Sequence, residues 1–176
     1  MAEEKKEPWL NQMALATVIL AVCATLSTFK GGGYSTLSVI SQTLASDQWA
    51  FYQAKSTKQH LYELQVEQFR LTAMSLPENS PVAKAYAEKI EEYQAKIKGY
   101  SQEKKQIEAK ARDLENQRDE AKRHGKPFGM AVMFLQVSIL LNSIAGLMKV
   151  KKIWGAAIPI GLIGLVFFLD GFFVFF

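Results

Sequence analysis

The sequence predicts an all-helical protein with three transmembrane helices and a long antiparallel helical hairpin, a coiled coil, outside the bilayer. Three observations lead to this fold class. Residues 8–29 and 128–176 contain only three lysines and one aspartate as charged side chains. Residues 30–127 hold sixteen of the 21 Lys and Arg and thirteen of the 17 Asp and Glu. Within this central segment, apolar residues recur with the 4-3 spacing of a two-helix seam.

Residues 9–29 form the first predicted transmembrane helix. At a rise of about 1.5 Å per residue this run spans about 30 Å, which matches the hydrocarbon core of a bilayer. Trp9 lies where an interfacial anchor belongs, and Lys30 ends the run. A cleaved secretory signal also carries lysines upstream, but its apolar region is shorter than this one. We therefore expect residues 1–8 to be a short N-terminus beside a retained helix.

Residues 128–148 and 153–176 are the second and third predicted transmembrane helices. The loop between them, residues 149–152, reads KVKK. The positive-inside rule places this loop in the cytoplasm, and counting crossings then places the N-terminus there as well. The central domain, residues 30–127, would lie outside. The cations that precede residue 128 oppose this orientation, but domains of this length cross a membrane largely regardless of charge.

The central domain is predicted to be a hairpin with arms at about residues 34–76 and 81–124. Ser80 is a good N-cap and Pro81 is suited to the first helical position, so the second arm begins there. The glycines at residues 31–33 lack the strand, Lys and Ser/Thr of a phosphate-binding loop. We expect them to form a flexible or bent joint instead.

An unbroken 4-3 pattern marks the second arm as one side of the coiled coil. Lys104 and Arg118 occupy two of its positions, which lowers stability but helps to fix register or partner. The first arm carries a matching stripe near the turn. The second-arm positions are Tyr86, Ile90, Tyr93, Ile97, Tyr100, Lys104, Ile107, Ala111, Leu114, Arg118 and Ala121, and the first-arm positions are Tyr62, Val66, Phe69, Ala73 and Leu76.

The first arm also has a second apolar stripe, formed by Leu61, Leu64 and Leu71. A two-helix hairpin has one seam to bury, so this surplus predicts a further partner. Self-association of the hairpin is the favoured interpretation, because an isolated helix pair is marginal in water. Another membrane protein is the second candidate partner.

Polar residues inside the predicted membrane helices are the other candidate site. Ser138 and Asn142 share a helix face, and Asp170 is the ionisable residue of the third helix. Helix association and an interfacial or capping role for Asp170 are the favoured interpretations. The alternative is an ion or substrate path through a small oligomeric channel or transporter subunit, because intramembrane carboxylates are often functional.

Two motifs carry a family resemblance, TLSTFKGGGYST at residues 25–36 and ASDQWAFYQAK at residues 45–55. The chain resembles a family of bacterial membrane proteins catalogued as a domain of unknown function. The resemblance implies a bacterial inner-membrane setting and no activity. In that setting, the outward placement of the central domain derived above puts the hairpin in the periplasm. Within the second motif, Trp49 and Tyr52 are candidate interface residues. We expect aromatic packing at the base of an oligomer, with a ligand contact as the alternative.

No residue pattern predicts catalysis, a cofactor or a metal. His60 has only Glu63 and Glu67 within helical reach, which is a poor ligand set. The net charge of +4 is spread along the chain and does not predict nucleic-acid binding, although it favours anionic lipid headgroups. We therefore expect a non-enzymatic, self-associating membrane scaffold or accessory protein whose partners are lipid, its own copies and, as an alternative, another membrane protein.

Overall fold

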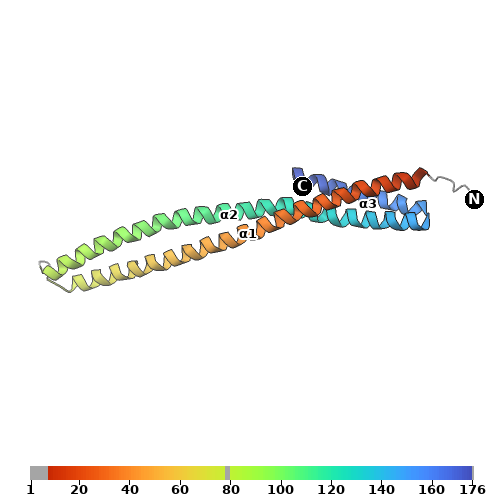
Figure 1. The fold of residues 1–176 in the computed structure, drawn as a ribbon. Coiled ribbons are helices and arrows are strands. Elements are labelled where there is room, and N and C mark those ends of the chain that lie inside the picture. Colours follow the sequence, from red (N-terminus) through yellow and green to blue (C-terminus); the bar gives the residue numbers. More distant parts are fainter. Residues whose placement is uncertain (1–7, 78–79, 176) are drawn as a thin grey trace, which may run out of the picture. The chain divides into compact units, whose positions relative to one another are not determined.

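The structure, a computed structural model, describes residues 8–77 and 80–175, and it contains three helices there and no strand. The helices are α1 (Pro8–Met74), α2 (Pro81–Met148) and α3 (Lys151–Phe173) (Figure 1). The all-helical prediction is confirmed. Each helix contains a stretch that is long and apolar enough to cross a membrane. Apart from Pro8, the predicted N-terminus at residues 1–8 lies outside the described residues.

Helices α1 and α2 each run without a break through an apolar segment and a charged segment. The predicted joint at residues 31–33 is wrong as a break in the chain's path, because these residues are helical and no described glycine has a positive φ. Gly31 serves helix packing instead. A Cβ at Gly31 would lie 3.1 Å from the Cβ of Phe128, so the missing side chain lets α1 and α2 approach closely.

The helix ends show the predicted capping chemistry. The Ser80 hydroxyl accepts a hydrogen bond from the N–H of Ala83 at 3.0 Å, and Pro81 is the first residue of α2. Only Lys149 and Val150 separate α2 from α3, so the connection is shorter than predicted. Lys149 has a left-handed φ of 53°, and the N–H of Val150 donates to the carbonyl of Ala145 at 3.1 Å. This is a Schellman ending for α2.

The described residues fall into two compact units. The three-helix unit comprises residues up to 40 and from 117 onward, and the two-helix unit comprises residues 41–116. Within the two-helix unit, α1 and α2 pack antiparallel. Tyr62 contacts Tyr93 with ring centroids 4.9 Å apart, and nearer the turn Phe69 contacts Tyr86 at 5.4 Å. Positions that rise along α1 therefore meet positions that fall along α2.

The packed positions of α1 and α2 recur in steps of four and three along each helix. All eleven predicted positions of the second arm are buried or half-buried. In α1 the same repeat extends far beyond the predicted stripe, through residues 13–69, and it includes many small or polar side chains. These additional α1 positions are Met13, Thr17, Leu20, Ala24, Ser27, Gly31, Tyr34, Ser38, Ser41, Ala45, Gln48, Tyr52, Lys55 and Gln59, all buried or half-buried. We call these positions the seam, together with the predicted second-arm positions and the matching first-arm stripe from Tyr62 to Leu76. The stripe of Leu61, Leu64 and Leu71 is not part of the seam.

The three-helix unit is packed through a small apolar core. Leu20 and Ala24 of α1 meet Ala131 and Leu135 of α2 there, and side chains of α3 pack against them. The buried residues of α3 are Ala157, Gly161, Gly164, Asp170 and Gly171. Four of these five residues are alanine or glycine, which lets α3 approach its neighbours closely.

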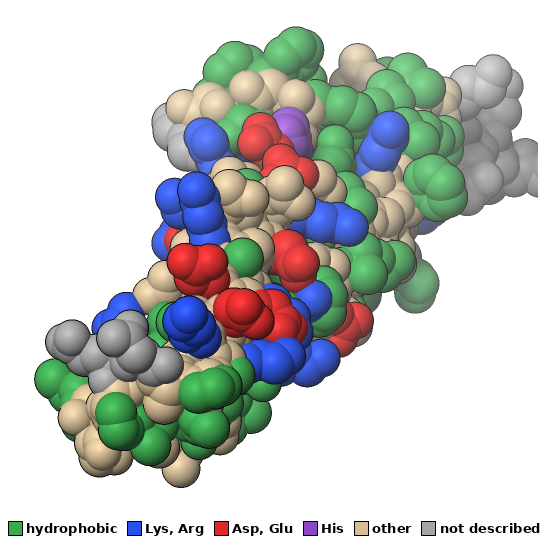
Figure 2. Space-filling view, turned by 90° about the vertical axis from the view of Figure 1, so that its left-hand side faces the viewer, with side chains coloured by type: hydrophobic (Ala, Val, Ile, Leu, Met, Phe, Trp, Pro, Cys, Tyr) green, Lys and Arg blue, Asp and Glu red, His purple; other side chains and the backbone are tan. Residues whose placement is uncertain are grey.

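The surface of the two-helix unit mixes charges of both signs. Figure 2 shows acidic and basic side chains interspersed on the face it displays, with hydrophobic side chains gathered beside the turn between α1 and α2. Near that turn, Met74 is 84% exposed and Val82 is 53% exposed. The mixed charges are typical of a helix pair in water, and the apolar residues at its end are available to a partner.

Candidate functional site

Buried polar side chains tie the helices of the three-helix unit together. The Ser138 hydroxyl of α2 donates a hydrogen bond to the carbonyl oxygen of Ala157 in α3 at 2.9 Å. Gly161 lies beside this contact, because a Cβ there would come within 2.8 Å of the Ser138 oxygen. The absence of a side chain at Gly161 therefore permits the hydrogen bond between α2 and α3.

Asn142 links α2 to α1 from a buried position. Its side-chain N–H donates to the Thr17 hydroxyl at 3.0 Å, and that hydroxyl donates to the carbonyl of Met13 at 2.8 Å. The Oδ1 of Asn142 is buried without a hydrogen-bond partner. Asn142 also lines a cavity of about 140 Å³, together with Ser138 and Trp154. An unsatisfied buried acceptor destabilises a fold by about 1–3 kcal/mol, so this cavity is suited to a polar occupant such as water.

Asp170 closes the end of α3. Its side chain is 2% exposed, and its Oδ1 accepts a hydrogen bond from the backbone N–H of Phe175 at 2.6 Å. Its carbonyl accepts from the N–H of Val174, which has a left-handed φ of 50°. The Asp170 carboxylate therefore accepts a backbone N–H just beyond the last residue of α3.

Asn142 and Asp170 do not share a site. Asn142 lies at the level of Thr17 and Trp154, whereas Gly171, next to Asp170, packs on the ring of Phe128. Asn142 and Phe128 are fourteen residues apart on α2, which corresponds to about 20 Å of helix rise. The two candidate polar residues are therefore at different depths of the three-helix unit.

An aromatic cluster that sequence reasoning missed joins the three helices near Phe128. Tyr34 of α1 stacks on His124 at 5.0 Å, and the Nδ1 of His124 lies 3.0 Å from the carbonyl oxygen of Gly171 in α3. Phe128 meets Phe172 of α3 edge-on at 5.1 Å. Because Gly31 and Gly171 both have close approach distances to Phe128, its buried position depends on two glycines. The seven-residue steps between Ala121, Phe128 and Leu135 were the signal that could have revealed it.

In the two-helix unit, the side chains of Trp49 and Tyr52 pack against each other. Their rings meet edge-on at 5.6 Å. The indole N–H of Trp49 donates to Oε1 of Glu115 at 3.0 Å, and the ammonium of Lys104 lies 5.2 Å from the Tyr52 ring centre. Both side chains are engaged by α2 of the same copy, so their described contacts are intramolecular.

The predicted surplus leucines are exposed. Leu61, Leu64 and Leu71 retain 58%, 63% and 65% of their accessible surface. Leu64 and Leu71 share one position of the seam's seven-residue repeat, on the side of α1 opposite α2. Leu61 lies at the neighbouring position around the helix. The packing of α1 on α2 therefore leaves this stripe uncovered.

Several ion pairs lie on the exposed charged surface and shift the pKa of their carboxylates. Glu92 accepts hydrogen bonds from Lys89 and Lys96, each at 2.7 Å, and these contacts lower the pKa of its carboxyl from 4.5 to about 2. The pKa of Glu63 is lowered by hydrogen bonds from Gln59 and then from His60. Such exposed pairs contribute little to stability because water screens them.

His60 is exposed, and its only described carboxylate contact is with Glu63 at 2.8 Å. Within residues 8–77 and 80–175, no group of three or more His, Cys, Asp or Glu side chains is placed to hold a metal ion.

The family comparison covers nearly the whole chain. Residues 9–174 match the family described as Domain of unknown function (DUF4337). The chain belongs to this family. No curated protein and no solved structure matches the chain. Because the match includes all three helices, the architecture described above is the architecture of a DUF4337 domain.

Proposed function

We propose that this DUF4337 protein is a membrane-anchored, self-associating scaffold or accessory protein. In this proposal the three-helix unit is embedded in a bilayer, and the two-helix unit projects into water as a coiled-coil hairpin. The exposed leucines of α1 bind a second copy. The proposal assigns the chain no catalytic step, cofactor or metal.

Outward-facing apolar side chains on all three helices support the membrane placement. Leu15 of α1, Leu140 of α2 and Leu162 of α3 are 65%, 60% and 57% exposed. A soluble protein rarely leaves such large apolar surfaces in contact with water, whereas lipid chains accept them. The lengths of these apolar stretches match a bilayer core.

The two-helix unit has the features of a coiled coil in water. Its seam has a 3.5-residue repeat, and the positions outside the seam carry charges of both signs. Lys55, a seam position of α1, also reaches across the pair to Glu103 of α2 at 2.6 Å.

The observation that carries the self-association proposal is the exposure of Leu61, Leu64 and Leu71 on the face of α1 away from α2. A single antiparallel helix pair buries little apolar surface and is marginal alone in water. Packing this stripe against its equivalent in a second copy would bury the leucines and form a self-complementary interface.

The lysines of the connection between α2 and α3 support the orientation. Lys149, Lys151 and Lys152 lie within two residues of a helix end and are exposed. On the positive-inside rule they face the cytoplasm, and the hairpin then lies in the periplasm of a bacterial inner membrane.

The test of self-association is the mass of the purified full-length chain in mild detergent, measured by light scattering with the detergent subtracted. We expect a defined oligomer for the natural sequence and a shift to monomer for the double variant Leu64→Gln and Leu71→Gln. The matched control is Ala50→Gln with Thr57→Gln. These residues are exposed at the same heptad position of α1 and carry no large apolar side chain.

Circular dichroism checks that both double variants remain helical. A monomeric natural sequence, or an oligomer that both double variants leave intact, would overturn the proposed leucine interface.

A second candidate function is a channel or transporter subunit, which the unpartnered Oδ1 of Asn142 beside its cavity favours. Because Asn142 and Asp170 lie at different depths, they would line separate points of such a path. Ion flux into proteoliposomes that is abolished by Asn142→Leu would support a channel. Flux that survives Asn142→Leu together with Asp170→Asn would exclude both residues from the path.

A further inference from the structure

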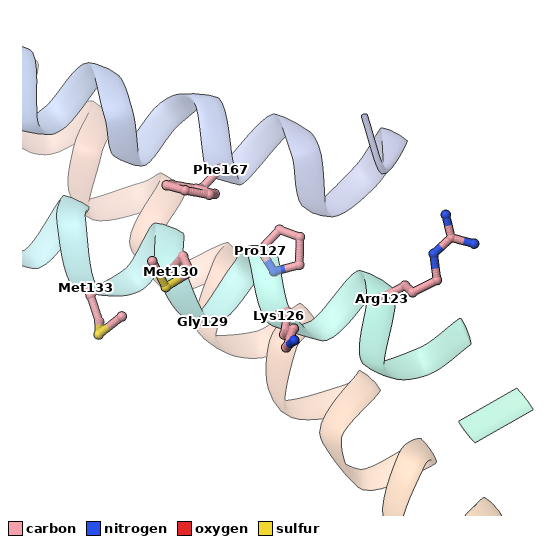
Figure 3. A pocket seen from close by; sticks show the side chains of 7 residues that line it. All are labelled: Arg123, Lys126, Pro127, Gly129, Met130, Met133 and Phe167. Carbon is pink, nitrogen blue, oxygen red and sulfur yellow. The ribbon is translucent and has the colours of Figure 1, made fainter. Parts of the chain in front are cut away.

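An amphipathic groove lies on the three-helix unit between α2 and α3. It has a volume of about 720 Å³, and its lining includes Arg123 and Lys126 as well as Met130, Met133 and Phe167. Figure 3 shows Arg123 at one end of the groove, Met133 at the other, and Lys126 between them, with the Arg123 and Lys126 side chains pointing in different directions. From Arg123 to Met133 the helix rises about 15 Å. The groove is therefore charged at one end and apolar along its length.

The cations of this groove lack the partners that other cations of the chain have. Arg118 pairs with Asp119 at 2.7 Å, and Lys55 pairs with Glu103. Among the described residues, neither Arg123 nor Lys126 forms an ion pair with a carboxylate. Their charges are therefore available to an external anion.

A second groove places hydroxyl groups beside the same cations. It has a volume of about 580 Å³, lies between α1 and α2, and is also lined by Arg123 and Lys126 together with Tyr34, Ser35 and Ser38. Arg and Lys are suited to phosphate, and hydroxyls can bond further headgroup oxygens. The hydroxyl groups of this second groove therefore add polar contacts beside the cations of the first groove.

The apolar end is held open by packing. Phe167 stacks on Phe134 at 5.7 Å with nearly parallel rings, which fixes its orientation. A Cβ at Gly129 would meet nothing within 4 Å, so this lining position leaves space rather than filling it. Met130 and Met133 are 37% and 55% exposed, and methionine adapts readily to flexible apolar ligands.

We propose that this groove binds an anionic phospholipid. Arg123 and Lys126 hold the headgroup phosphate, and one acyl chain lies along Met130, Met133 and Phe167. Charge complementarity selects the anionic headgroup, and the apolar lining requires the chain. The proposal rests on the membrane embedding proposed above, but it does not depend on self-association, because all of these residues belong to one copy.

The test measures binding of fluorescent phosphatidylglycerol to the full-length protein in mild detergent. The competitors are unlabelled phosphatidylglycerol, phosphatidylcholine with the same chains, and inorganic phosphate. We expect phosphatidylglycerol to compete best. Arg123→Gln with Lys126→Gln should weaken its binding about 30-fold, since each basic residue near anionic lipid contributes about 1 kcal/mol, which is about a fivefold factor.

Two matched controls separate this site from general effects. Lys151→Gln with Lys152→Gln removes two exposed cations from the other end of the three-helix unit and should leave the affinity unchanged. Gly129→Leu should fill the groove and weaken binding. Gly155 of α3 has equally open surroundings but lies outside the groove. Gly155→Leu should therefore leave the affinity unchanged.

Equal competition by phosphatidylcholine would overturn the headgroup assignment. Competition by inorganic phosphate as strong as that by phosphatidylglycerol would make the site a soluble-anion site and would overturn the lipid assignment. If the Arg123→Gln, Lys126→Gln variant and the Lys151→Gln, Lys152→Gln variant lost equal affinity, the effect would be one of general surface charge, and the groove would not be the site. The light-scattering mass of each variant distinguishes failure of this site from failure of self-association.

Discussion

The hydroxyl of Ser138 is buried where α2 packs on α3, and it donates across the interface rather than to its own helix. Ser143, one and a half turns later, donates to the carbonyl of Ile139 in the same helix and is exposed. The same residue type therefore has two roles in α2. In a lipid environment, interhelical hydrogen bonds contribute to association because apolar side chains gain little by leaving lipid for protein.

Replacing Ser138 by alanine should destabilise the three-helix unit by about 0.5–1.5 kcal/mol, because one interhelical hydrogen bond is lost and little volume changes. Ser143→Ala should change stability by a smaller amount. The measurement is the unfolding free energy in mixed detergent micelles. Equal effects of the two substitutions would contradict the importance of the bond to Ala157.

The candidate residues were predictable from sequence to different degrees. Exposure of Leu61, Leu64 and Leu71 followed from their offset from the seam. The partner of Trp49 did not, because Glu115 lies 66 positions away and nothing local identifies it. The same holds for His124 and the Gly171 carbonyl, which meet only after three helices have packed. Contacts between elements depend on register, which a single sequence does not fix.

Among the elements, α1 shows how one repeat can serve two kinds of packing. In the two-helix unit its seam carries large side chains such as Tyr62, Val66 and Phe69. In the three-helix unit most of its seam residues are small, such as Ser27 and Gly31, although Met13, Leu20 and Tyr34 are large. Water favours burial of large apolar groups, whereas lipid offers no such gain and favours small residues that let helices approach. The change in side-chain size agrees with the proposed change of solvent.

The unbroken path of α1 through residues 31–33 could not be predicted from local propensity. Each glycine lowers helix stability by about 1 kcal/mol relative to alanine, so three in a row favour a joint. Packing of Gly31 against Phe128 is a tertiary interaction that compensates for this tendency. By contrast, the start of α2 at Ser80 and Pro81 was predictable, because capping is local chemistry.

Two glycines of α3, Gly164 and Gly155, should respond in opposite ways to replacement by alanine. A Cβ at Gly164 would lie 2.8 Å from Cγ and 3.0 Å from the backbone nitrogen of Leu135. Gly164→Ala should therefore destabilise the three-helix unit by about 1–3 kcal/mol. Gly155 has open surroundings, so Gly155→Ala should be neutral or should stabilise by up to about 1 kcal/mol through helix propensity.

Unfolding in mixed micelles measures both alanine variants. If Gly164→Ala were as stable as Gly155→Ala, the close approach of α3 to Leu135 would be wrong. Helix content by circular dichroism serves as the control that each variant still forms α3.

For the whole molecule, the account depends on a division of solvent along the chain. The three-helix unit exposes leucines on every helix, and the two-helix unit exposes mixed charges. In the proposed membrane placement, exposure in the structure means contact with lipid in one unit and with water in the other. The three helices were predictable from charge distribution and the antiparallel packing from the seam. The merging of segments into two helices of 67 and 68 residues was not.

The most direct test of this division is cysteine labelling in intact bacterial membranes with a membrane-impermeant maleimide. It uses a Cys23→Ser background in which Gln94, Lys152 or Leu140 is replaced by Cys. We predict that Gln94→Cys reacts from the periplasmic side and Lys152→Cys only after permeabilisation. Leu140→Cys should stay unreacted until the membrane is dissolved, although Leu140 is 60% exposed. Reaction of Leu140→Cys in intact membranes as fast as that of Gln94→Cys would contradict the account.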